Sequence, residues 1–290
     1  MSIHLQHRAE NLAALLPPLL LEAERVASIV RQGTHGRRRA GQGETFWQFR
    51  RYAAGDPAER IDWRQSARTD KYFIREREWE AAQSVYLWAD NSGSMRYQSE
   101  KKYPQKSESA QILMLALASL LLRGGETLTW LSPTPIAARG RNGLERIART
   151  LETETDAPSL PPSLPIAKHA HMILCSDFLM PHDEFEQRMR HYAALNLRGA
   201  LVHILDPAEL ALPFDGRIEM KGLEGEAPLL LQNAAGLRAA YARKMQEHQD
   251  WLMHIAESAG WFYLRHVTDA PPHSALMQLF DYLAADHRGI

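Results

Sequence analysis

A cluster of oxygen-bearing side chains follows one apolar stretch of the sequence. The stretch VYLWA is followed by Asp90, Ser92 and Ser94, with Gly93 between the two serines. One carboxylate and two hydroxyls brought together by a tight glycine bend are donors of the kind that a hard divalent cation such as Mg²⁺ binds. The same residues are also compatible with an ordinary polar turn, so this pattern alone leaves both interpretations open.

A second carboxylate stands in a similar place. Asp177 follows the apolar stretch MILCS, directly after Ser176. In open sheets of parallel strands, ligands bind at the carboxyl ends of the strands. If the two stretches are neighbouring strands, Asp90 and Asp177 face the same crevice. This second carboxylate favours a metal site over a simple turn.

From residue 83 onward, apolar strand-like stretches alternate with helical patterns. Such alternation predicts an α/β fold with a mainly parallel sheet and helices on both faces. The strands are expected at 84–90, 126–133, 169–177, 200–206 and 261–267, and the helices at 106–125, 143–154, 182–199, 236–260 and from 274 onward.

The N-terminal part of the chain has a different character. It opens with a helical pattern over residues 5–31, and a loop rich in glycine and arginine follows. Residues 31–75 contain eleven basic and five acidic residues, although the whole chain has a net charge of -1. Aromatic and β-branched residues around a GDP turn then predict short strands. We therefore expect an accessory element over residues 1–80 and an α/β domain over residues 81–290.

The totals restrict the class of protein. Cys175 is the one cysteine, which excludes an internal disulfide and fits a reducing compartment. The longest apolar run covers the eleven residues 112–122, about half the length of a membrane-spanning helix. No signal peptide is visible. These features predict a soluble, cytoplasmic protein without a transmembrane segment. The stretch HGRRRAGQG could contact phosphates, but in a chain of this net charge we expect no nucleic-acid partner.

Common catalytic motifs are missing. The sequence has no GxxxxGK[ST] phosphate loop and no GxSxG nucleophile elbow, and Ser92 stands where an aspartyl-phosphate enzyme would carry a second carboxylate. These absences argue against an ATPase, a serine hydrolase and a phosphatase of the aspartyl-phosphate type. A Mg²⁺-dependent phosphoester hydrolase stays open as an alternative, with Asp90 and Asp177 holding the ion and His182 acting as the base.

Two stretches resemble known families. DNSGSM after a hydrophobic strand, with LCSD about ninety residues later, resembles the metal-ion-dependent adhesion site of von Willebrand factor A domains. The stretch FRRYAAGDPAERIDWRQSARTDKYFIRERE is similar to the signature of the bacterial family called domain of unknown function 58. The resemblance extends from about residue 42 to the C-terminus and implies a von Willebrand factor A-like, Rossmann-type fold.

The resemblance also implies roles for individual residues. Asp90, Ser92, Ser94 and Asp177 match metal ligands, and the ion would be Mg²⁺, Mn²⁺ or Ca²⁺. A threonine that normally adds a ligand before the second helix has no counterpart here, and Asn142 falls near its position. This departure leaves a site that is weak, completed by water, or empty.

A binding function follows from the same resemblance. In adhesion-site domains, a carboxylate of a partner takes the open position on the metal. Members of the family resemble companions of MoxR-type AAA+ ATPases, which are thought to act as remodelling or maturation chaperones. The resemblance therefore implies a non-enzymatic adaptor that works with such an ATPase on a client protein.

A mixed cluster stands in the N-terminal signature, formed by Asp56, Arg60, Asp62, Trp63 and Arg68. Alternating charges usually satisfy each other, so one interpretation is a structural cluster of ion pairs around a buried tryptophan. A second interpretation is a surface that contacts a partner beside the metal loop. In a third, Asp56 or Asp62 caps the metal itself.

Overall fold

The computed structural model describes Ala27, Ile61 and the ranges 46–52, 63–67, 71–77, 84–153, 158–220 and 229–286. The chain divides into two compact units. One unit comprises residues 34–82, and the other comprises residues 1–33 with 83–290. The helix predicted over residues 5–31 lies outside the described residues apart from Ala27, which is helical and buried.

The smaller unit is built around a two-stranded antiparallel sheet. Strand β1 (Phe46–Arg51) pairs with β2 (Phe73–Arg77), and the short helix α3 (Trp63–Ser66) lies between them in the sequence. The Ser66 hydroxyl accepts a hydrogen bond of 2.9 Å from the backbone N–H of Phe73, which ties α3 to the start of β2. The short strands predicted from the aromatic and β-branched residues are therefore present.

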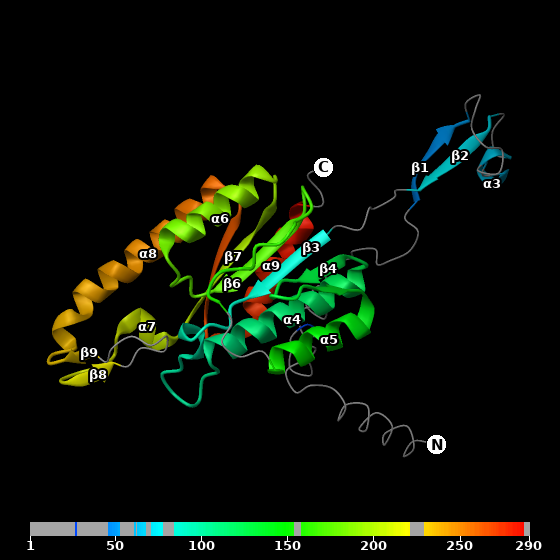
Figure 1. Ribbon diagram of the computed structural model, residues 1–290. Helices are drawn as coiled ribbons and strands as arrows, with labels where there is room; N and C mark the ends of the chain where they lie inside the picture. Colours follow the sequence, from blue (N-terminus) through cyan, green and yellow to red (C-terminus); the bar gives the residue numbers. More distant parts are fainter. Residues whose placement is uncertain are drawn as a thin grey trace, which may run out of the picture. The chain divides into compact units, whose positions relative to one another are not determined.

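The larger unit contains a six-stranded sheet in the order β10-β7-β6-β3-β4-β5 (Figure 1). All neighbouring pairs are parallel except β4 and β5, which form an antiparallel edge. The strands are β3 (Ser84–Ala89), β4 (Thr127–Trp130), β5 (Ile136–Ala138), β6 (His171–Ser176), β7 (Arg198–Leu205) and β10 (Phe262–Val267). The predicted α/β fold with a mostly parallel sheet is confirmed.

Helices cover both faces of this sheet (Figure 1). One core cluster packs α4, α5 and α9 against the sheet, and a second core cluster packs α6 and α8 against the opposite side chains of the same strands. The helices are α4 (Lys106–Gly124), α5 (Gly140–Thr153), α6 (His182–Ala194), α7 (Pro207–Ala211), α8 (Arg238–Ser258) and α9 (Pro272–Asp286). Burial on both faces explains why the central strands are apolar throughout rather than alternating.

Helix α4 is the central helix of the first core cluster. Its side chains from Lys106 to Leu121 are buried except for Glu108, as the apolar run in the sequence predicts. The helix ends where Gly125 adopts a left-handed conformation with φ of 90°, a backbone geometry that glycine adopts without steric cost.

A small extension interrupts the alternation after β7. Helix α7 is followed by β8 (Ile218–Met220) and β9 (Leu229–Leu231), which pair as an antiparallel ribbon close to the start of α8 (Figure 1). In the part of the chain that the structure describes, no helix is long and apolar enough to cross a membrane.

Candidate functional site

Three neighbouring strands end in a buried carboxylate. Asp90, Asp177 and Asp206 follow β3, β6 and β7, which lie side by side in the sheet. Each of these side chains is at most 2% exposed. Because parallel strands end at one edge, the sequence places three acidic groups together at the carboxyl edge of the sheet.

The Asp90 loop is held by neutral hydrogen-bond donors. Oδ1 of Asp90 accepts from the backbone N–H of Ser92 at 2.8 Å, and Oδ2 accepts from the Ser176 hydroxyl at 2.6 Å. The hydroxyls of Ser92 and Ser94 lie 3.2 Å apart. The structure therefore brings together the three oxygen-bearing residues that the sequence singled out, and adds Ser176 to them.

The charge on Asp90 is poorly compensated. Burial raises the pKa of Asp90 to about 7, and the nearby charge of Asp177 adds to the effect against the lowering effect of the hydroxyl bond from Ser176. Within the described residues, no lysine or arginine forms an ion pair with Asp90. A cation in this loop would favour the ionised carboxylate, because an opposite charge lowers the pKa of an acid.

Asp177 has a different environment. Its Oδ2 lies 2.8 Å from the ammonium of Lys106, and its Oδ1 accepts from the backbone N–H of Leu179 at 3.1 Å. Lys106 is 1% exposed and also lies 2.6 Å from Oε1 of Glu209. One buried ammonium thus joins two acidic groups that come from different elements.

The pKa directions agree with a charged cluster. Burial alone would lower the pKa of Lys106, but the charges of Asp177 and Glu209 outweigh it and raise the pKa above its ordinary value. Burial raises the pKa of Glu209, against the lowering effect of Lys106. The lysine therefore stays protonated and acts as the permanent cation of this cluster.

Lys106 and Glu209 were not singled out from the sequence. A signal for Lys106 was present, because a positive charge in the first turn of a helix opposes the helix dipole and requires compensation. Lys106 is the first residue of a helix that is mostly apolar from Ile112 to Leu122. Glu209 could have been noticed as the fourth residue of the capping box that begins at Asp206, but nothing in the sequence pairs it with Lys106.

Asp206 has a structural role. Its Oδ1 accepts from the backbone N–H of Ala208 at 2.8 Å, while Glu209 accepts from the N–H of Asp206 at 2.7 Å. These two reciprocal hydrogen bonds cap α7. The other carboxylate oxygen of Asp206, Oδ2, accepts from the backbone N–H of Ser99 at 3.0 Å, which fixes the loop between β3 and α4.

The other candidates lie elsewhere. Asn142 is exposed in the first turn of α5, and no described contact joins it to Asp90. Thr134 is exposed, and its carbonyl accepts from the Ser132 hydroxyl. Thr134 lies earlier in the sequence than the missing threonine and is the less favoured substitute for it. No described contact joins either residue to Asp90, and Asn142 stays a prediction.

The N-terminal cluster is described only in part. Asp56, Arg60, Asp62 and Arg68 lie outside the described residues. Trp63 is 63% exposed and contacts Tyr72 edge-to-face with 6.0 Å between ring centroids. Within its own unit the indole ring of Trp63 is open to solvent, so its role in a structural cluster or in a partner surface stays a prediction.

Comparison with known proteins gives the family. The match is to the family described as "Protein of unknown function DUF58", over residues 48–251. The chain belongs to the DUF58 family. "Uncharacterized protein Rv1480" of Mycobacterium tuberculosis is 26% identical to it over 257 residues, which cover 82% of this chain and 79% of that protein.

Two solved structures also match this DUF58 chain. One is the "conserved hypothetical protein BatB from Bacteroides thetaiotaomicron", with 12% identity, a TM-score of 0.42, and coverage of 70% of this chain and 100% of that one. The other is an "aerotolerance-related membrane protein from Bacteroides fragilis", with 13% identity, a TM-score of 0.40, and coverage of 69% and 98%.

The expectation of a cytoplasmic location is corrected. A third solved structure that matches is an "Uncharacterized Membrane Spanning Protein from Vibrio fischeri", with 17% identity, a TM-score of 0.22, and coverage of 70% of this chain and 99% of that one. The expectation is contradicted by this description and by the description of the Bacteroides fragilis match as a membrane protein. The physical reason is that cysteine count and hydropathy describe the chemistry of a chain, whereas its location depends on what it is attached to. We assign no location.

Proposed function

We propose that this DUF58 chain is a non-enzymatic adaptor with a von Willebrand factor A-like domain. Its partner site is the carboxyl edge of the sheet, where a divalent cation receives a carboxylate of a partner protein. The proposal further takes a MoxR-type AAA+ ATPase as the protein with which the adaptor remodels or matures a client.

The environment of Asp90 is the observation that carries this proposal. Its carboxylate is fully buried, receives only neutral donors within the described residues, and lies beside the hydroxyls of Ser92 and Ser94. This all-oxygen donor set fits Mg²⁺, which accepts few protein ligands and keeps water among the rest. When bound, the ion would supply the positive charge that a partner carboxylate requires.

Asp177 has a modified role in this proposal. Its Oδ2 is engaged by Lys106 at 2.8 Å, so direct ligation of a metal through that oxygen would compete with a buried ammonium. Asp177 therefore contributes its charge to the site and orders the loop after β6, while Asp90, Ser92 and Ser94 hold the ion.

The MoxR-type partner rests on the family resemblance. Trp63 supports a contact surface in the smaller unit, because an exposed tryptophan is the kind of residue that dominates protein interfaces. Asp56, Arg60, Asp62 and Arg68 remain candidates for the same surface.

Partner binding can be measured directly. A MoxR-type ATPase from the same genome is immobilised, and binding of the wild-type chain is compared in Mg²⁺ and in chelator. We expect Mg²⁺-dependent binding that Ser92→Ala weakens at least tenfold and that the control Thr134→Ala leaves unchanged. Binding that is equal in chelator and in Mg²⁺ would contradict a metal-mediated contact.

The hydrolase alternative has one supporting observation. His182, its candidate base, lines the same cavity as Asp177. Its ring, however, is stacked on Trp251 with 3.7 Å between centroids, a contact typical of a packed ring. Hydrolysis of p-nitrophenyl phosphate that requires Mg²⁺ and disappears in Asp90→Ala would favour the enzyme over the adaptor.

A further inference from the structure

A cavity of about 470 Å³ lies beside the ion cluster of Lys106, Asp177 and Glu209. The proposed metal ligands of the Asp90 loop do not line it. It is bounded by the ends of β6 and β7 and by α6, α7 and α8, and its lining includes three histidines, His182, His203 and His248. This volume falls in the range of small-ligand pockets and is about three times that of a cavity that holds one benzene.

His203 is a buried polar side chain whose unsatisfied nitrogen indicates that a ligand binds here. Its side chain is fully buried, and its Nδ1 lies 2.8 Å from the Tyr263 hydroxyl. Its Nε2 has no hydrogen-bond partner within the described residues, although the residue lines the cavity. A buried polar nitrogen without a partner is costly, so a group that bonds Nε2 would recover that free energy.

Burial keeps the His203 ring neutral. Together with the positive charges around it, burial holds the pKa of His203 well below its ordinary value. The ring therefore carries one proton, on Nδ1 or on Nε2 according to which atom donates in the bond to the Tyr263 hydroxyl. In either tautomer Nε2 has no partner within the described residues, and a ligand hydroxyl can bond it as donor or as acceptor.

The walls of the cavity are flat aromatic rings. The ring of His182 stacks on Trp251 with an interplanar angle of 14°, and His248 stacks on the same indole at 28° with 5.5 Å between centroids. Leu179, which also lines the cavity, is 57% exposed. Such surfaces favour a ring that can stack and be covered by apolar side chains.

Charged groups at the cavity are already paired. Glu209 is held by Lys106 at 2.6 Å, and Lys244 lies 3.4 Å from Glu247. With Asp177, which also pairs with Lys106, the groups at the cavity are three carboxylates and two ammoniums, and both ammoniums are already engaged. The lining therefore disfavours an anionic ligand group.

We propose that this cavity binds an uncharged aromatic group that carries a hydroxyl, with Nε2 of His203 as its hydrogen-bond partner. The group is presented either by a free small molecule or by an aromatic side chain of a partner protein. His248 connects the cavity to the carboxyl edge, since its Nε2 lies 3.2 Å from the carbonyl oxygen of Asp177.

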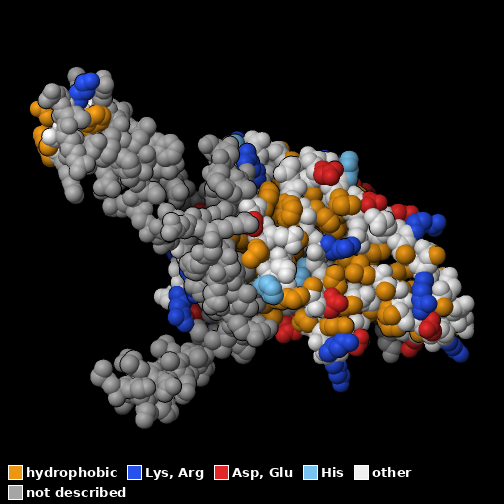
Figure 2. Space-filling view, turned by 180° about the vertical axis from the view of Figure 1, so that it is seen from behind, with side chains coloured by type: hydrophobic (Ala, Val, Ile, Leu, Met, Phe, Trp, Pro, Cys, Tyr) orange, Lys and Arg blue, Asp and Glu red, His pale blue; other side chains and the backbone are white. Residues whose placement is uncertain are grey.

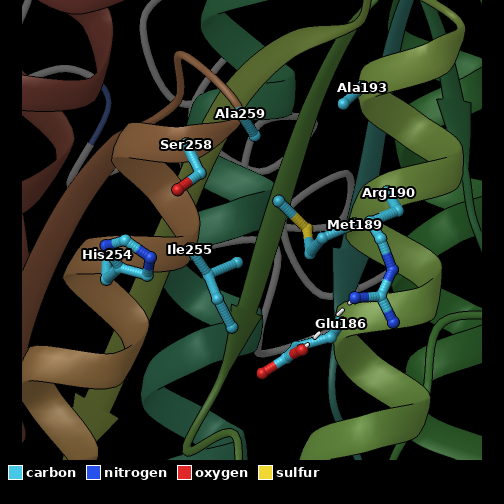
Figure 3. A pocket seen from close by; sticks show the side chains of 8 residues that line it. All are labelled: Glu186, Met189, Arg190, Ala193, His254, Ile255, Ser258 and Ala259. Carbon is cyan, nitrogen blue, oxygen red and sulfur yellow. Dashed lines mark hydrogen bonds and ion pairs between the residues drawn. The ribbon is translucent and has the colours of Figure 1, made fainter.

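A second cavity, of about 270 Å³, lies between α6 and α8 (Figure 3). It differs from the first cavity in how its polar side chains are satisfied. Its principal polar group, Glu186, accepts from the Trp251 indole at 3.0 Å and pairs with Arg190. No buried side chain that lines it lacks a partner within the described residues. It therefore carries no ligand proposal.

The surface of the molecule carries charges of both signs. Figure 2 shows basic and acidic side chains interspersed on one face, with hydrophobic side chains gathered between them.

Two matched probes test the proposal. 4-Methylphenol and 1,4-dimethylbenzene have nearly the same shape, but only the first has a hydroxyl that can bond Nε2. Their Kd values are measured by NMR titration of the full chain in chelator, so that failure of the metal site does not affect the result. We expect at least tenfold tighter binding of 4-methylphenol. Equal affinity for the two probes, or no binding of either, would overturn the proposal.

A pair of variants locates the site. Met245 lines the cavity on α8, whereas Met253 lies on the same helix, is 36% exposed and is not among the lining residues. Met245→Trp fills the cavity and should weaken 4-methylphenol binding at least tenfold, while Met253→Trp should leave it unchanged. Unchanged binding in Met245→Trp would place the probe elsewhere and contradict the proposal.

A third probe separates the two sources of the ligand group. N-acetyltyrosinamide carries the same phenol on a peptide backbone. Tighter binding than 4-methylphenol would support a partner side chain, and tenfold weaker binding would support a small molecule, because the backbone would then obstruct entry.

Discussion

Asp90 and Asp177 differ in what surrounds them, although their positions are equivalent. Both follow neighbouring parallel strands, and both are buried. Asp177 meets the ammonium of Lys106, whereas Asp90 meets backbone and hydroxyl donors within the described residues. The comparison teaches that a strand end fixes where a carboxylate lies, while residues from distant elements decide whether its charge is compensated.

The ion cluster at Asp177 gives the largest expected effect. Lys106→Met leaves the buried carboxylates of Asp177 and Glu209 without their cation, which should lower the free energy of unfolding by about 3–5 kcal/mol. Urea denaturation measures the loss. The matched control is Lys102→Met, because Lys102 pairs with Glu100 at 2.9 Å on the surface, where the loss of an ion pair has little effect on stability. Equal losses in the two variants would remove the distinction between a buried and an exposed pair.

Replacing each carboxylate by its amide sharpens the comparison. Asp177→Asn weakens a charge-assisted bond to Lys106 and should cost about 2 kcal/mol in chelator. Asp90→Asn removes a charge that burial disfavours and keeps an acceptor for the N–H of Ser92, so its stability should equal or exceed that of the wild type. If the two amides destabilise the chain equally, the two carboxylates are not in different environments.

A smaller effect is expected for the hydroxyl that supports Asp90. Ser176→Ala removes the 2.6 Å bond to Oδ2 and should lower the free energy of unfolding by about 1–2 kcal/mol. Ser258→Ala, on the exposed surface of α8, should change it by less than about 0.5 kcal/mol. Thermal denaturation in chelator compares the two, and an effect of Ser176→Ala no larger than that of Ser258→Ala would contradict the bond.

Much of the fold could be predicted from the sequence. Apolar stretches such as residues 84–89 and 171–176 form strands because they are buried on both faces, and the glycine pair after α4 ends that helix as expected. The small ribbon of β8 and β9 was not predicted, because its strands are three residues long and give no clear period.

The candidate site could be predicted only in part. The strand ends predict the positions of Asp90, Ser92, Ser94 and Asp177, because each of these residues stands shortly after an apolar stretch in the sequence. Lys106 is separated from Asp177 by 71 positions and from Glu209 by 103, so their contact depends on the packing of three elements. His203 was not singled out from the sequence, because its unpaired nitrogen and the cavity beside it follow only from packing.

The central claim is that the Asp90 loop takes a divalent cation while Asp177 already has Lys106. The most direct test is the melting temperature in chelator and in 10 mM Mg²⁺ for the wild type, Ser92→Ala and Thr134→Ala. If the Kd is about 1 mM, linkage gives roughly 1.4 kcal/mol of stabilisation, a rise of about 2 °C or slightly more. We predict this rise in the wild type and in Thr134→Ala, and its loss in Ser92→Ala. No rise in the wild type, or an equal rise in Ser92→Ala, would contradict the claim.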